Sequence, residues 1–214
     1  MTLSEGRLFT LGHNGLKDGG IDSVVAIEVA SGKELWRHSY PEKLADHYYE
    51  GGTSGTPTVD GGKVYTLSKS GVALCLEAAT GKVLWSRNLS QGAGLKVPEW
   101  GFAGAPHIHG DRVIYNAGEA GLALDKVTGR ELWSSGKGSA GYGTPVPFAL
   151  AGKPALALFG LREVIVVDPA SGKEQWRHPW KTRYDVNAAD PVILGDTMVL
   201  TSGYGTGACG LQFT

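Results

Sequence analysis

One short motif occurs four times along this chain, and its spacing constrains the fold more than any other feature of the sequence. The motif reads Ser/Thr-Gly-Lys/Arg-x-x-Trp and ends at Trp36, Trp85, Trp133 and Trp176, so the tryptophans are 49, 48 and 43 residues apart. A period of this length fits the four-stranded blades of a β-propeller. No stretch places apolar residues at helical spacing, which argues against a helical solenoid. One repeat therefore corresponds to one blade.

Each motif predicts a tight hairpin between two strands. Its glycine stands where a reversal needs a positive φ, and the preceding Ser or Thr can hydrogen-bond to the local backbone. A carboxylate four residues before each glycine can cap the N–H groups of the turn. The predicted hairpins cover residues 26–36, 73–85, 123–133 and 166–176, with glycines Gly32, Gly81, Gly129 and Gly172 and carboxylates Glu28, Glu77, Asp125 and Asp168.

The four tryptophans are interpreted as packing residues, because a large ring with one N–H suits the seam between adjacent sheets. A residue that recurs in every blade serves the blade rather than a reaction. We expect an all-β fold of four-stranded antiparallel blades with tryptophan-docking repeats, spanning residues 1–214 as one partial domain. Residues 1–3 should keep only the end of an innermost strand, and residues 187–214 should form a truncated blade.

The predicted arc holds about four and a half blades, and alone it would expose apolar seams and strand edges. The sequence is therefore interpreted as a fragment, about half of an eight-bladed ring.

Charge and hydropathy exclude several classes of partner. The 20 basic and 21 acidic side chains are interspersed and give a net charge of -1, so no basic surface for nucleic acid is predicted. Apolar runs are of strand length, far below the roughly 18 residues of a membrane span, so no transmembrane segment is predicted. Residues 1–20 lack an apolar core and do not read as a secretory signal peptide.

At the repeated motif the chain resembles the PQQ-like (pyrroloquinoline-quinone repeat, quinoprotein alcohol dehydrogenase-like) β-propeller family, and its connecting segments are similar to those of bacterial members. The resemblance covers nearly the whole chain. It implies a periplasmic or secreted parent protein. Relatives of this kind include quinone-dependent alcohol dehydrogenases and a periplasmic lipoprotein of the outer-membrane barrel-assembly machinery, so the repeat indicates fold and not function.

Candidate binding residues lie in the connections that should open on one face around the central channel. They are polar or aromatic: Tyr49, Glu50, Trp100, Tyr142, Arg162, Asn187 and Asp190, with Tyr204 in a neighbouring loop. One hypothesis is that they converge on a flat polar ligand such as a quinone or a sugar, with Trp100 or Tyr142 stacking and Arg162 pairing an anionic group. The alternative is that they are solvated or pack against the next blade.

No metal site is predicted. His107 and His109 alternate on one face of a strand, but His109 occupies the turn position of Asp60 in the preceding blade. By the resemblance, a calcium-dependent quinoprotein would show two adjacent cysteines, whereas Cys75 and Cys209 are far apart in sequence.

Two functions remain from the sequence. The favoured one is a non-catalytic binding or scaffold module that meets a protein partner or a small polar ligand at the channel mouth, with no cofactor evident. The alternative is part of a PQQ-dependent quinoprotein oxidoreductase acting on alcohols, for which PQQ and calcium would be the cofactors.

Overall fold

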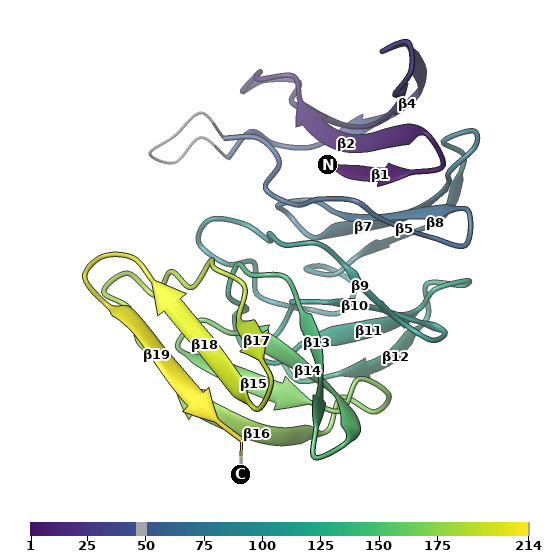
Figure 1. Cartoon of the computed structure of the whole chain (residues 1–214). Coiled ribbons are helices and arrows are strands. Elements are labelled where there is room, and N and C mark those ends of the chain that lie inside the picture. The colour runs from purple at the N-terminus through teal and green to yellow at the C-terminus, as the bar shows by residue number, and fades with distance from the viewer. Residues whose placement is uncertain (46–50, 214) are drawn as a thin grey trace.

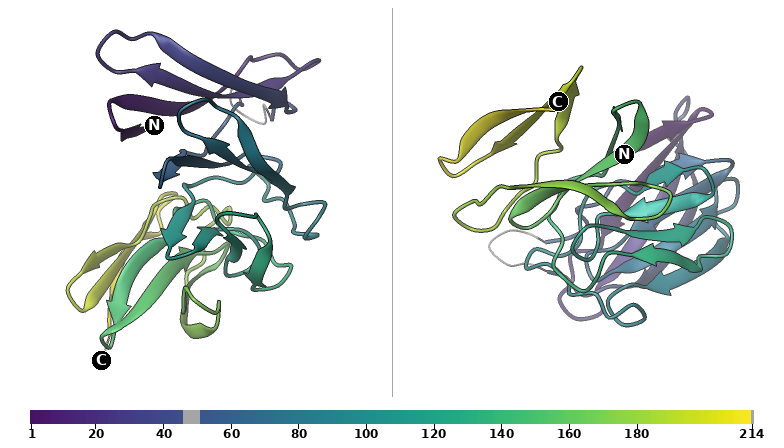
Figure 2. Two further views of the ribbon diagram at one scale, coloured as in Figure 1. Left: turned by 90° about the vertical axis from the view of Figure 1, so that its right-hand side faces the viewer. Right: turned by 90° about the horizontal axis from the view of Figure 1, so that it is seen from below.

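The computed structural model describes residues 1–45 and 51–213, and the regular elements in this part of the chain are all β-strands. They form antiparallel sheets that follow one another in chain order along an arc (Figure 1). The two further views in Figure 2 show the same succession of sheets. No helix in the described ranges is long and apolar enough to cross a membrane.

The first four sheets each contain four strands in sequence order. They are β1 (Thr2–Ser4), β2 (Arg7–His13), β3 (Ile21–Glu28) and β4 (Glu34–Pro41); β5 (Thr58–Asp60), β6 (Lys63–Leu67), β7 (Val72–Glu77) and β8 (Val83–Asn88); β9 (His107–His109), β10 (Arg112–Tyr115), β11 (Leu122–Asp125) and β12 (Glu131–Ser134); β13 (Val146–Leu150), β14 (Lys153–Phe159), β15 (Glu163–Val167) and β16 (Glu174–Pro179). The fifth sheet has three strands: β17 (Val192–Leu194), β18 (Thr197–Ser202) and β19 (Gly207–Gln212).

This arrangement confirms the predicted all-β blades and corrects one detail at the beginning of the chain. Residues 1–3 do not keep merely the end of a strand. Strand β1 has three residues, like β5 and β9, and pairs with β2 from Thr2 opposite Phe9 to Ser4 opposite Arg7. The first sheet is therefore a four-stranded blade.

The core lies between the sheets rather than inside any one of them. Phe9 of the first sheet packs with Leu74 of the second, and Ile114 of the third packs with Leu156 of the fourth. The middle strands are buried along nearly their whole length, and successive side chains point to opposite faces, so each sheet has one apolar face for each neighbour. The innermost strands β1 and β5 contact each other, as do β5 and β9, which places the first strand of these blades on the inner side of the arc.

The repeated tryptophans lie at these seams. The indole Nε1–H of Trp36 donates to the carbonyl of Ala78 in the next blade at 3.0 Å. The indole of Trp85 makes the same bond to Lys126 at 3.1 Å, and that of Trp133 to Pro169 at 3.2 Å. Each of these rings thus buries apolar area and satisfies its one N–H across the seam.

The motif glycine of each following blade lies directly under the incoming ring. A Cβ atom on Gly81, Gly129 or Gly172 would lie 2.5, 2.7 or 2.5 Å from the nearest atom of the preceding blade's tryptophan, closer than carbon atoms can approach. These glycines also have φ of 74°, 69° and 71°. Glycine is therefore needed twice, for its backbone conformation and for the contact.

The carboxylates before the glycines act in two different ways. Asp125 Oδ1 accepts the backbone N–H groups of Val127 at 3.0 Å and Thr128 at 2.7 Å, and Asp168 caps its own turn in the same manner. Glu28 and Glu77 instead accept hydroxyl groups, from Ser31 and Thr80. The capping prediction is thus confirmed for the aspartates, whereas the longer glutamate side chains bond to the hydroxyls of the turn.

Candidate functional site

The inner rim of the arc is built from the residues that precede the proline at the start of an innermost strand. Ala105 N–H donates to the hydroxyl of Thr144 in the next blade at 3.1 Å, and Thr144 N–H donates to Asp190 Oδ1 at 2.5 Å. Here the backbones of successive blades approach so closely that a Cβ on Gly104 would lie 2.7 Å from the carbonyl oxygen of Gly143. Side chain to backbone bonds therefore join the third, fourth and fifth blades at the rim.

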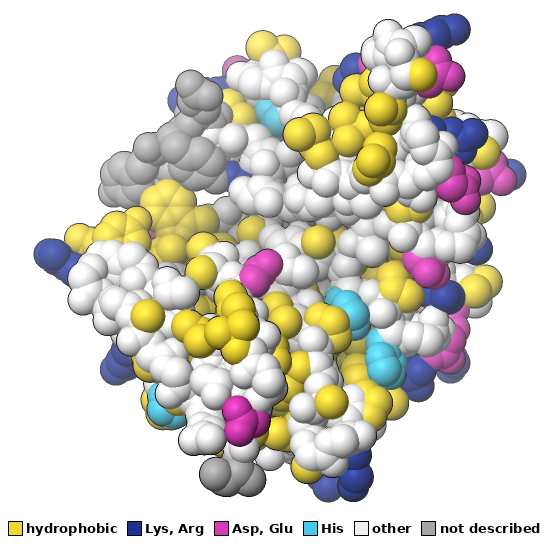
Figure 3. All heavy atoms as spheres, in the orientation of Figure 1, with side chains coloured by type: hydrophobic (Ala, Val, Ile, Leu, Met, Phe, Trp, Pro, Cys, Tyr) yellow, Lys and Arg dark blue, Asp and Glu magenta, His cyan; other side chains and the backbone are white. Residues whose placement is uncertain are grey.

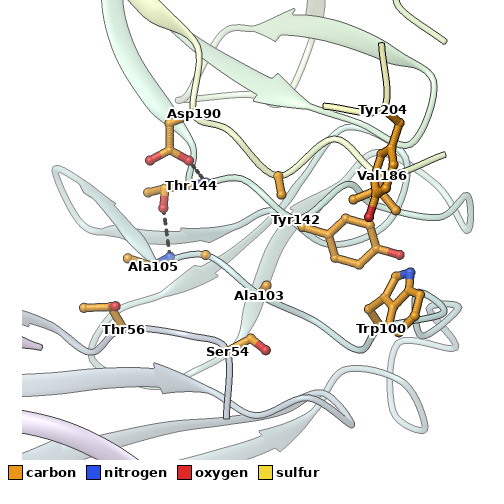
Figure 4. Close-up of a pocket in the computed structure, with 12 residues that line it drawn as sticks. Ser54, Thr56, Trp100, Ala103, Ala105, Tyr142, Thr144, Val186, Asp190 and Tyr204 are labelled. Atoms are coloured by element: carbon orange, nitrogen blue, oxygen red, sulfur yellow. Dashed lines mark hydrogen bonds between the residues drawn. The ribbon is translucent and has the colours of Figure 1, made fainter. Parts of the chain in front are cut away.

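A cavity of about 710 Å³ opens beside this rim. Its lining combines aromatic rings, hydroxyl groups, small side chains and one carboxylate: Ser54, Thr56, Trp100, Ala103, Gly104, Ala105, Tyr142, Thr144, Val186, Ala188, Asp190 and Tyr204. In Figure 4, Trp100, Tyr142 and Tyr204 gather on one side of the cavity, and Asp190 and Thr144 lie on the other. No lysine or arginine belongs to the lining that the described residues form.

Three of the predicted site residues therefore share one cavity: Trp100, Tyr142 and Asp190. Tyr142 is 8% exposed, and the backbone N–H of Trp100 bonds to its hydroxyl. Burial raises the pKa of Tyr142, and the nearby carboxylates of Glu99 and Asp185 raise this pKa further. The phenol therefore stays protonated near neutral pH, in surroundings that disfavour negative charge.

Arg162 lies outside the lining of this cavity. Its guanidinium forms a two-pronged ion pair with Asp185, with Nε 3.0 Å from Oδ1 and Nη2 2.7 Å from Oδ2. The Asp185 carboxylate raises the pKa of Arg162 and keeps it charged. Asp185 has φ of 53° and Tyr204 has φ of 57°, in the left-handed region that non-glycine residues seldom adopt.

Asn187 is fully buried and bonded to protein on both sides of its amide. Its Nδ2 donates to the carbonyls of Gly160, Leu161 and Trp180 at 3.1 to 3.2 Å. Its Oδ1 accepts the hydroxyl of Ser202 at 3.0 Å. The amide thus connects the fourth and fifth blades beneath the surface and does not line the cavity.

The remaining predictions have different outcomes. Tyr49 and Glu50 lie outside the described residues. Thr56, Thr144 and Ser54 line the cavity and were not singled out from the sequence. The recurring residue-Pro step at 56–57, 105–106, 144–145 and 190–191 was the signal that could have found the two threonines, because it marks the same rim position in four blades.

A second polar region lies at the seam between the first two blades. Asp22, on β3, is 1% exposed, and burial together with the Glu42 carboxylate raises its pKa to about 6. Its surroundings also include His13, Tyr40 and Lys69. Glu42 and Lys69 line a neighbouring cavity of about 690 Å³.

Metal-ligating side chains do not gather into a site in the part of the chain that the structure describes, where no three His, Cys, Asp or Glu residues are suitably grouped. His107 and His109 lie on β9, and burial and the proximity of His109 lower the pKa of His107.

Residues 21–212 match the family model described as outer membrane protein assembly factor BamB. No relative was found among curated protein sequences. A crystal structure of BamB from Moraxella catarrhalis is 16% identical with a TM-score of 0.63, and the match covers 90% of this chain and 54% of that one.

Two alcohol-oxidising dehydrogenases have a similar fold. Quinohemoprotein alcohol dehydrogenase from Comamonas testosteroni is 17% identical with a TM-score of 0.60, covering 96% of this chain and 41% of that one. A europium-containing methanol dehydrogenase is 15% identical with a TM-score of 0.64, covering 92% of this chain and 46% of that one. This chain spans about half the length of these structures, and at such identity the likeness concerns the fold alone.

Proposed function

The chain belongs to the PQQ-like repeat family whose model is described as outer membrane protein assembly factor BamB, and we propose that it is a non-catalytic binding module. In this proposal it meets a protein partner or a small polar ligand through the cavity at the inner rim. The chemistry of the cavity lining carries the proposal: its described residues combine aromatic rings, hydroxyl groups and a single carboxylate. Such a mixture of apolar faces and few fixed polar groups is typical of recognition sites.

The cavity is a poor match for pyrroloquinoline quinone, which carries three carboxylates. Taking such an anion out of water favours a site that offers cationic partners. The described residues that line the cavity contribute Asp190 and no lysine or arginine. Arg162, the cation expected to pair with an anionic group, is held by Asp185. The alternative, a quinone-dependent oxidoreductase acting on alcohols, therefore lacks the electrostatics that its cofactor needs in this cavity.

Calcium meets a similar difficulty at Asn187 and Asp190, the amide and carboxylate among the candidate binding residues. Ca²⁺ takes six to eight oxygen ligands, among them carboxylates and amide carbonyls. Asn187 Oδ1 already accepts a hydrogen bond from Ser202, and Asp190 Oδ1 accepts one from Thr144. The two oxygens act within the protein, and using them for a metal would break bonds between blades.

The experiment is a titration of the protein with pyrroloquinoline quinone and calcium, read by tryptophan fluorescence and by calorimetry. We expect no saturable binding and no reduction of an artificial electron acceptor when an alcohol is added. One-to-one binding that Trp100→Leu weakens would refute the proposal in favour of the oxidoreductase. Tyr115→Phe, a substitution at a buried tyrosine away from the cavity, serves as the control.

The family suggests where such a module works. The matched family description refers to outer membrane protein assembly, and we place the action of this chain in the periplasm or outside the cell on that ground. A fusion of the protein to a reporter that is active only outside the cytoplasm tests this location. A fusion that accumulates in the cell without reporter activity would contradict it.

A further inference from the structure

Three aromatic side chains from three different loops line the cavity. Trp100 comes from the connection between β8 and β9, Tyr142 from that between β12 and β13, and Tyr204 from that between β18 and β19. Figure 4 shows them grouped on one side of the cavity, together with Val186. Because each ring comes from a separate loop, their convergence is a property of the arc and not of one local sequence.

The charged side chain that lines the cavity together with these rings is a carboxylate. Asp190 lines the same cavity, and the carboxylates of Glu99 and Asp185 act on Tyr142. Arg162 balances Asp185, and Asp190 is the acidic group among the described residues of the lining. On the face shown in Figure 3, Lys and Arg side chains lie mainly along the outline, whereas the hollowed middle is mostly hydrophobic or uncharged.

Aromatic faces attract cations, because the ring quadrupole puts negative charge above and below the ring plane. The chain already makes one such contact beside the cavity. The guanidinium carbon of Arg183 lies 5.2 Å from the centroid of the Tyr184 ring, and Tyr184 packs edge to face on Tyr204 with 5.0 Å between centroids. A ring that packs on the cavity-lining Tyr204 therefore already holds a cation against its face.

We propose that the cavity binds an organic cation, an alkylammonium or quaternary ammonium group, between Trp100, Tyr142 and Tyr204, with the Asp190 carboxylate supplying the longer-range attraction. This inference rests on the proposed binding function and names the ligand class of the same site. A quaternary ammonium group matches the site best because it keeps its charge while it loses little hydration on entering an aromatic cavity. The cation is either a free small molecule or a side chain of a partner protein.

The test compares choline with its neutral isostere, in which a carbon replaces the nitrogen, in calorimetric and NMR titrations of the whole chain. We expect choline to bind roughly tenfold tighter or more, since the two differ only in charge. Equal binding of the two probes would overturn the cation proposal and leave the binding function standing. No binding of choline even at tens of millimolar would also overturn it.

Substitutions then separate the cation–aromatic attraction from packing. Trp100→Phe keeps an aromatic face and should lower choline affinity roughly threefold or less, whereas Trp100→Leu should lower it about tenfold. Tyr204→Asn serves as a second variant, because Tyr204 is 65% exposed and asparagine tolerates its positive φ. A weakening of several-fold is expected there, and unchanged affinity in both Trp100→Leu and Tyr204→Asn would refute the site.

Asp190→Asn removes the charge and keeps an oxygen that can accept the N–H of Thr144. We expect choline affinity to fall several-fold at low salt and the difference to shrink at high salt, because screening weakens the attraction. If choline binds Asp190→Asn as tightly as the wild type at low salt, the Asp190 carboxylate does not attract the cation.

Titration with a short peptide that carries one trimethyl-lysine separates the two sources of the cation. Binding tighter than that of choline indicates a side chain, and binding no tighter indicates a small molecule. Quinone binding with calcium, by contrast, would remove the proposed function itself.

Discussion

The seams between the blades and the cavity at the inner rim use the same kind of side chain in opposite ways. At the seams, Trp36, Trp85 and Trp133 each contact a glycine and a carbonyl of the next blade, so one contact recurs with the period of the sequence. At the rim, Trp100 and Tyr142 belong to connections that do not repeat, and they line a shared cavity instead of a seam. An aromatic residue therefore acts according to its position in the repeat.

The difference also concerns which groups are satisfied by the protein. The indoles at the seams donate their single N–H to a backbone carbonyl of the neighbouring blade. At the rim, one oxygen of Asp190 accepts the N–H of Thr144. Hydroxyl groups and aromatic rings form the rest of the cavity wall together with small side chains. Stability comes from repeated, closed contacts, and recognition comes from residues that stand outside the repeat.

Adding one methyl group at a seam glycine should produce the largest effect. Gly129→Ala places a Cβ 2.7 Å from the Trp85 ring at a φ of 69°, and we expect a loss of about 2–4 kcal/mol in the free energy of unfolding. Gly32→Ala is the matched control, since its φ is 72° and no atom lies within 4 Å of the added carbon. It should cost about 1 kcal/mol, the backbone penalty alone.

Urea unfolding of both glycine variants measures this difference. Equal losses would mean that the glycine is needed only for its φ, and that the tryptophan contact does not stabilise the seam.

Substitutions of one buried residue and one cavity-lining residue test the same comparison at the rim. Asn187→Ala removes the donor for three carbonyls and the acceptor for Ser202, so we expect a loss of about 2–3 kcal/mol of stability. Asp190→Asn, which keeps an acceptor for Thr144, should change stability by less than about 0.5 kcal/mol. Thermal and urea unfolding of the two variants decide whether Asn187 is the structural residue and Asp190 the one available for binding.

The buried carboxyl at the seam of the first two blades should make stability depend on pH. The pKa of Asp22 is raised from 3.8 to about 6 in the folded protein, so the folded state holds this proton more tightly than the unfolded state. The stabilisation is present in full below the unfolded pKa and is lost as pH rises from about 4 to about 6. Asp22→Asn has no carboxyl that titrates at this position. Its free energy of unfolding relative to that of the wild type should therefore rise by about 1–2 kcal/mol between about pH 4 and about pH 6.

Urea unfolding of wild type and Asp22→Asn between pH 4 and pH 7 gives the stability difference directly, because other titrating groups are common to both proteins. A difference that does not change over this range would show that the Asp22 pKa is not raised.

Much of the architecture followed from the four tryptophan motifs. Their period and their glycines predicted the blades and hairpins, and the structure has both. The expectation that residues 1–3 keep only the end of an innermost strand was wrong, because residues 2–4 form a strand as long as β5 and β9 and pair with β2. At the cavity, the sequence indicated Trp100, Tyr142 and Asp190 by residue type, but it gave no reason to separate them from Asn187, whose amide is buried and fully bonded.

The sequence alone determined the repeat. Each blade contains its own turn hydroxyl, its own glycine with positive φ and its own tryptophan four residues after that glycine, and these requirements are local. Only the tertiary structure decided which nonrepeated residues share a cavity. Trp100, Tyr142 and Tyr204 are separated by about 40 to 60 residues and meet because successive blades rotate around one rim. The physical reason is that seam contacts are fixed between neighbours, whereas a cavity at the rim depends on the curvature that all the seams produce together.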